Sequence, residues 1–154
     1  MKKAEMTAEQ LAFRQSVIGL LTAQGWSGPR EEQAFEADLI LETELSLTKR
    51  NAQCLMEFRY SFEYDYLAFL VAQPLQGHAD YILYHRGLPD SLTLMQIILA
   101  QVDQMSFESS LEVFRELCRE RPGDIYFFDG AQSLELTPEN MVDIVKGNPT
   151  NRVL

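Results

Sequence analysis

Alternating apolar and polar positions over residues 35–66 predict two long strands joined by a tight turn. Every second residue of 35–47 is apolar or threonine, and most residues between them are acidic. The alternation resumes over residues 52–66, after a polar turn at 49–51. Successive strand residues point to opposite faces, so one face should join a core and the other should meet solvent. The expected core face of the second strand holds Cys54, Met56, Phe58, Tyr60, Phe62, Tyr64 and Tyr66.

The chain before and just after this hairpin predicts a helix and two more strands. Thr7 and Gln10 form a capping-box pattern at the start of an amphipathic helix that should stop at Gly25. Trp26 follows, and we expect it to pack in the core rather than to anchor a partner. The unbroken apolar run 67–72 predicts a central strand covered on both faces. A further strand is predicted over 81–85.

The C-terminal half predicts mostly helices. A helix should begin at residue 90 or 91 and run to about 105, apolar nearly all round and therefore buried. Ser106 caps the next helix, which should end before Pro122. A short strand over 125–128 and a partner at 134–136 precede a last helix over 137–146.

This order of elements predicts an α+β fold. We expect an antiparallel sheet of about four to six strands, built on the long hairpin, with helices packed on one face. The 154 residues should form a single domain, residues 1–154, with 148–154 as a frayed tail. Hydrophobic residues make up 46% of the chain and charged residues 23%, values that are ordinary for a globular protein.

The net charge of -10 bears on the choice of partner. A negative field repels phosphate backbones, so nucleic-acid binding is not expected. It favours a basic protein partner, because complementary charge accelerates association. No run approaches the roughly 20 apolar residues of a membrane span, and no apolar leader follows Lys2 and Lys3. Two isolated cysteines, Cys54 and Cys118, read as buried thiols, so we expect a cytoplasmic protein without disulfides.

Residues suited to catalysis are few. His78 and His85 are the only histidines, and their spacing matches no metal-ligand pattern. No Gly-x-Ser-x-Gly sequence and no glycine-rich phosphate loop occurs. We therefore expect no catalytic residue, no metal and no cofactor. If the chain is an enzyme, the best nomination is His85 with Glu63 or Asp65.

Acidic residues concentrate on the solvent face of the predicted hairpin. Residues 31–44 contain six acids and no Lys or Arg. Like charges on adjacent strands repel each other, so this pattern indicates a binding surface, although acids also keep edge strands soluble. Ile40 and Leu55 lie among these charges and, with Arg59, could form the dry centre of an interface unless a helix covers them. The expected partner-binding residues are Glu36, Asp38, Ile40, Glu42, Glu44, Leu55, Glu57, Arg59, Glu63 and Asp65.

Three functions remain open at this point. The first is an immunity-type inhibitor that neutralises a basic toxin or effector domain by charge-complementary occlusion. The second is a secretion chaperone or adaptor, because the chain is similar in size, charge and element order to the chaperones of type III secretion. That similarity implies a homodimer with apolar grooves for an extended peptide, whereas an inhibitor can be monomeric. The third is an enzyme with an unrecognised site.

Overall fold

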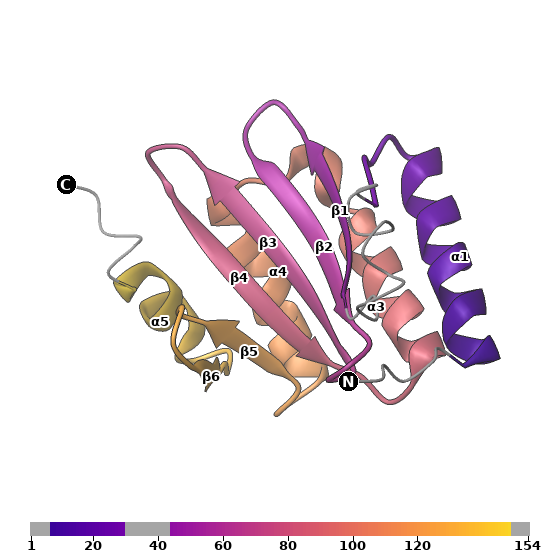
Figure 1. Cartoon of the computed structure of the whole chain (residues 1–154). Helices are drawn as coiled ribbons and strands as arrows, with labels where there is room; N and C mark the ends of the chain where they lie inside the picture. The colour runs from indigo at the N-terminus through magenta and orange to yellow at the C-terminus, as the bar shows by residue number, and fades with distance from the viewer. Residues whose placement is uncertain (1–6, 30–43, 149–154) are drawn as a thin grey trace.

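The computed structural model describes residues 7–29 and 44–148 of the chain. In these residues helices pack on one face of a six-stranded antiparallel sheet, which confirms the predicted α+β class (Figure 1). In chain order the elements are α1 (Ala8–Ala23), β1 (Glu44–Arg50), β2 (Leu55–Ser61), β3 (Tyr66–Gln73), β4 (Gly77–Tyr84), α3 (Leu88–Leu99), a 3-10 turn (Val102–Gln104), α4 (Phe107–Glu120), β5 (Ile125–Phe128), β6 (Ser133–Glu135) and α5 (Met141–Gly147).

The strands lie in the sheet in the order in which they occur in the chain, from β1 to β6. β1 and β2 form the predicted hairpin, with Leu47 opposite Phe58, but the turn lies at residues 51–54 rather than at 49–51, because β1 continues to Arg50. β3 and β4 are the longest strands and pair along their whole length. The link between β4 and β5 contains α3 and α4, which pass behind the sheet in Figure 1. This strand order places β3 and β4, residues 66–84, in the middle of the sheet.

The core lies between the sheet and the helices. Phe58, Phe69, Tyr81 and Phe127 project from four neighbouring strands into this layer and are 1% exposed or less. Phe114 of α4 stacks on Tyr81, with ring centroids 3.8 Å apart. Stacked rings and buried aliphatic side chains together supply the main stabilisation of the fold.

The start of the chain folds as its sequence predicts. Thr7 and Gln10 form the capping box of α1, since each side chain bonds the backbone N–H of the other. The helix ends at Ala23, two residues before Gly25, whose φ is 88°. Trp26 is buried, and its ring lies 5.0 Å from that of Phe58. It is a core residue, as expected.

The second predicted strand is too long. Core positions alternate as expected through Tyr60, but β2 ends at Ser61 and a turn occupies residues 62–65. Asp65 has a φ of 54°, which interrupts the extended backbone. Tyr64 is consequently 69% exposed, and Tyr66 begins β3 on the face away from the helices. The prediction of both tyrosines as core residues was wrong because the turn resets the alternation.

Several helix boundaries also differ from the predictions. α3 begins at Leu88, with Pro89 in its first turn, and ends at Leu99 rather than near residue 105. It is not buried all round, because Ile97 is 41% exposed. α4 begins after Ser106 as predicted. α5 begins at Met141, although Thr137 and Asn140 bond each other's backbone N–H in the manner of a capping box, so the predicted start at Thr137 is present as a turn over residues 138–140.

Candidate functional site: the open face of the sheet

The face of the sheet opposite the core is formed by alternate residues of the strands. No helix among residues 7–29 and 44–148 covers this open face. The predicted central place of the 67–72 strand is confirmed, and cover on its second face is not provided by any helix of the described residues. Its apolar run reflects one buried face and one face of small or half-buried residues, Ala68, Leu70 and Ala72. We define the open face by Glu44, Ser46, Thr48, Arg50, Leu55, Glu57, Arg59, Ser61, Tyr66, Ala68, Leu70, Ala72, His78, Asp80, Ile82, Tyr84, Tyr126, Phe128, Ser133 and Glu135.

An ion-pair cluster centred on Arg59 lies in the middle of the open face. One guanidinium nitrogen, Nη2, donates to both oxygens of Asp80 over 3.1 and 3.0 Å. Nη1 donates to Glu57 over 3.2 Å, and Nε lies 3.9 Å from Glu44. Ser46 donates to the other oxygen of Glu57 over 2.6 Å. Three carboxylates thus surround one cation, which leaves a local charge of about -2 when all are ionised.

Partial burial changes the protonation energetics of this cluster. Burial acts to lower the pKa of Arg59, but Asp80, Glu57 and Glu44 outweigh it and raise the pKa, so the guanidinium is charged. Desolvation raises the pKa of Asp80 above the ordinary carboxyl value, even though Arg59 acts in the opposite direction. The hydrogen bonds from Nη2 to both oxygens of Asp80 therefore hold the two side chains together at an electrostatic cost to the partly buried carboxylate.

Three tyrosines form a ladder across the neighbouring strands. Tyr66 and Tyr84 lie opposite each other on β3 and β4, with ring centroids 6.3 Å apart. Tyr84 contacts Tyr126 of β5 edge-to-face, with centroids 5.3 Å apart and planes at 89°. Tyr84 is 40% exposed and Phe128 39%. Ala68 and Ile82, which belong to the same face, are buried.

The structure brings together only some of the residues that were expected to bind a partner. Glu44, Leu55, Glu57 and Arg59 lie together on the open face, although Arg59 serves the charged cluster rather than a dry centre. Glu63 and Asp65 are exposed in the β2–β3 turn, so their predicted place on the strand face was wrong. The remaining candidates lie outside the described residues; they are Glu36, Asp38, Ile40 and Glu42.

Sequence reasoning missed the tyrosine ladder and Asp80. The available signal was the pair of alanines, Ala68 and Ala72, which share one face of the 66–72 run while Leu67, Phe69 and Val71 share the other. Leu70 interrupts this contrast, so the run is apolar on both faces and does not distinguish them. Tyr84 and Tyr126 are distant in sequence, and only the β4–β5 pairing of Ile82 with Tyr126 brings them together.

His85 and Asp65, the residues nominated for catalysis, both contact the hydroxyl of Tyr60. The Tyr60 hydroxyl lies 2.8 Å from His85 Nε2 and donates to the Asp65 carboxylate. His85 Nδ1 accepts the backbone N–H of Gly87 over 3.0 Å, so the neutral ring carries its proton on Nε2. Burial and Asp65 raise the pKa of the Tyr60 hydroxyl. Both ring nitrogens of His85 are engaged within the fold, which suits a structural link between β2, β4 and α3.

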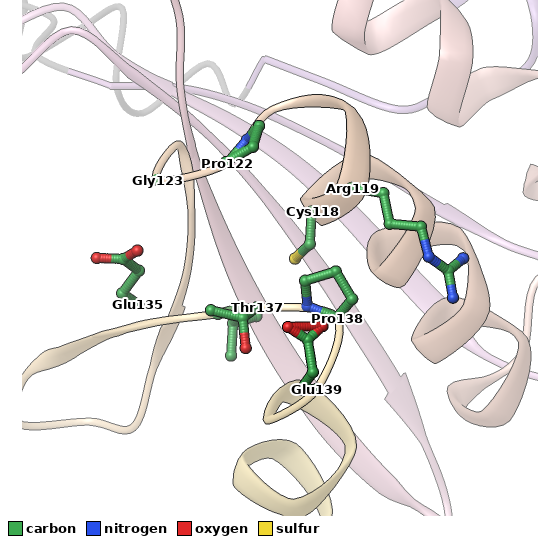
Figure 2. Close-up of a pocket in the computed structure, with 9 residues that line it drawn as sticks. Cys118, Arg119, Pro122, Gly123, Glu135, Thr137, Pro138 and Glu139 are labelled. Carbon is green, nitrogen blue, oxygen red and sulfur yellow. The ribbon is translucent and has the colours of Figure 1, made fainter.

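A second candidate site is a cavity of about 380 Å³ beside the C-terminal end of α4. Figure 2 shows the Cys118 sulfur pointing toward the Thr137–Pro138 segment, while Arg119 extends away from it. Burial, and then the charge of Glu139, raise the pKa of the Cys118 thiol to about 11. A protonated thiol is a poor nucleophile and a poor metal ligand, so the cavity offers no evident chemistry.

Comparison with known proteins gives this chain neither a family nor a function. The chain matches no known protein family, no curated protein and no solved structure among those compared. In the described part of the chain, no group of three or more His, Cys, Asp or Glu side chains could hold a metal ion. None of the helices in that part is both long and apolar enough to cross a membrane.

Proposed function

We propose that this chain is a non-catalytic binding protein whose open face docks a basic, folded protein. The most specific form of the proposal is an immunity-type inhibitor that neutralises a toxin or effector domain by covering its basic active site. The observation that carries it is the juxtaposition of an acid-rich cluster and half-exposed tyrosines on a sheet face without helical cover among the described residues.

Electrostatics support this choice of partner. Glu44, Glu57 and Asp80 exceed the positive charge of Arg59, and the whole chain carries -10. Such a field steers a cationic protein toward the face and raises its association rate. Arg59 holds its carboxylates in fixed positions, so a partner's Lys or Arg meets acceptors that lose little freedom on binding.

The tyrosine ladder supplies the apolar part of such an interface. Tyrosine is enriched at the centres of protein interfaces, where it buries a large ring and keeps a hydroxyl for hydrogen bonding. A ring face beside a carboxylate is also a favourable place for a guanidinium or ammonium group. Tyr84 and Tyr126 lie edge-to-face, so a cation can approach one ring face while the other ring supports it.

The proposal is tested by affinity capture from the lysate of the chain's own source. The intact protein is immobilised at low salt, bound proteins are eluted by raising the salt concentration, and mass spectrometry identifies them. The open-face variant is Glu44→Lys/Glu135→Lys, and the matched control is Glu112→Lys/Glu120→Lys on α4, which changes the net charge equally on the helical layer. We expect one basic protein, retained by the wild type and the control and lost from the open-face variant.

Kinetic measurement with the recovered protein makes the test quantitative. The open-face variant should associate more slowly, and its rate should depend less on salt, because rim charges act mainly on association. Identical association for the two variants would refute the proposal. Light scattering separates the chaperone alternative, which requires a homodimer that binds extended peptides, from a monomeric inhibitor of a folded domain.

A further inference from the structure

The hairpin between β3 and β4 ends in a turn that is unfavourable for one of its residues. The backbone N–H of Gln76 donates to the carbonyl of Gln73 over 3.1 Å, which closes a turn with Pro74 and Leu75 at its centre. Leu75 has a φ of 68°, the left-handed value that the second central residue of a type II turn requires. Glycine adopts this value freely, whereas the Cβ of leucine crowds its own backbone there.

Packing does not compensate for this strain. The side chain of Leu75 is 87% exposed, and the other large apolar residues that are exposed in the described structure are less so. Residues held in sparsely populated backbone conformations tend to occur at functional sites. A leucine that is both strained and exposed therefore points to a role outside the chain's own fold.

The base of the hairpin is held firmly. β3 and β4 pair at every position from Tyr66 opposite Tyr84 to Gln73 opposite Gly77. The side-chain oxygen of Gln73 accepts the backbone N–H of Phe107 over 2.8 Å, which ties the hairpin to the first residue of α4. A side chain presented from a fixed base loses little conformational entropy on binding, which favours affinity.

The hairpin that carries Leu75 contributes no acidic side chain. Residues 66–79 contain no Asp, Glu, Lys or Arg in a chain that carries -10. A row of Arg50, Leu55, Ala72 and His78, which pair across β1 to β4, connects the tip with the open face. Carboxylates thus gather at the Arg59 cluster, and the hairpin presents Leu75 without one.

We propose that Leu75 is the apolar anchor of the partner interface. It inserts into an apolar pocket that lies beside the basic surface of the protein bound by the open face. This inference rests on the proposed function, because it assigns a second contact to the same partner. The charged contact accelerates encounter, and burial of the leucine slows dissociation.

The test uses Leu75→Gly and Leu75→Asn in the full chain, with the basic protein eluted from the wild type as the probe. Both variants should raise the urea midpoint, or leave it unchanged, because glycine and asparagine tolerate the left-handed conformation. Both should bind the probe at least about tenfold more weakly, mainly through faster dissociation. The control Ile97→Gln, at an exposed apolar position on α3, should bind as the wild type does.

Each alternative outcome overturns the inference. Unchanged affinity of Leu75→Gly would exclude an anchoring role. A lowered urea midpoint in both variants would show that the turn does not disfavour leucine, and weaker binding would then reflect damage to the fold. If Glu44→Lys/Glu135→Lys weakens binding and Leu75→Gly does not, only this inference fails. If the wild type retains no basic protein, the proposed function fails with it.

Discussion

The two faces of the sheet carry side chains of similar chemistry with opposite consequences. Tyr81 and Tyr84 lie three residues apart on β4, yet Tyr81 is fully buried against Phe114 while Tyr84 is 40% exposed. On the covered face, burial of aromatic surface stabilises the fold. On the open face, comparable area remains available to a partner. The difference arises from where the helices pack, and it separates residues that hold the fold from residues offered for binding.

The largest effect on stability is expected when one aromatic ring is truncated on each face of the sheet. Phe114→Ala leaves a cavity beside Tyr81 and Phe69, and should lower the free energy of unfolding by about 3–5 kcal/mol. Tyr84→Ala removes a ring that is 40% exposed and contacts only Tyr66 and Tyr126 among the aromatic rings of the described residues, and it should cost less, about 1–2 kcal/mol. Urea denaturation of the two variants measures both values. Equal losses would contradict the division between a structural and an exposed face.

A smaller effect is expected within the charged cluster. Asp80→Ala removes the carboxylate that accepts both hydrogen bonds from Nη2 of Arg59 and should cost about 1–3 kcal/mol, because the guanidinium is partly buried. Glu44→Ala, at the exposed rim 3.9 Å from the same guanidinium, should change the free energy of unfolding by less than about 0.5 kcal/mol. Equilibrium unfolding gives both values, and a larger loss from Glu44→Ala would reverse the ranking.

Single hydroxyl groups give a finer comparison. Tyr60→Phe removes the group that links His85 to Asp65 and should lower the free energy of unfolding by about 1 kcal/mol. Tyr84→Phe removes a hydroxyl on the open face and should be close to neutral. Thermal and urea unfolding of the two variants provide the comparison. A neutral Tyr60→Phe would show that the link contributes no stability.

The smallest expected effects are on how the free energy of unfolding changes at acid pH. They have opposite signs at the Asp90–Arg121 and Asp80–Arg59 pairs. Burial acts to raise the pKa of Asp90, but hydrogen bonds from Arg121 and the Arg86 backbone outweigh it and the pKa is lowered. Asp90 therefore contributes stability above the ordinary carboxyl pKa, which is lost as pH falls through its folded pKa. The pKa of Asp80 is raised, so its contribution increases as pH falls through that value.

Variants of these two carboxyl groups check the signs. From neutral pH to about pH 3, Asp90→Asn should flatten the acid loss of stability relative to the wild type, and Asp80→Asn should steepen it. Urea midpoints at several pH values, with the fold verified by circular dichroism, supply the curves. Changes of the same sign in both variants would be inconsistent with the geometry of the two pairs.

Much of the covered face could be predicted from the sequence. The alternation that ends at Tyr60, the capping residues Thr7 and Ser106, and the burial of Trp26 are local patterns with one favoured structure. Local rules are strong where a side chain has a single low-energy environment. Predictions failed at residues 62–66, because a four-residue turn costs little and leaves the apolar pattern of the flanking strands unchanged.

The candidate site was less predictable. The sequence by itself determined the acidic character of the chain, the hairpin with one apolar face, and the membership of Glu44, Leu55, Glu57 and Arg59 in one solvent face. Tertiary structure decided that the helices of residues 7–29 and 44–148 pack on the other face, and that Tyr66, Tyr84 and Tyr126 meet on this one. The physical reason is that strand period specifies two faces, whereas the choice of which face the helices cover depends on contacts between residues far apart in the chain.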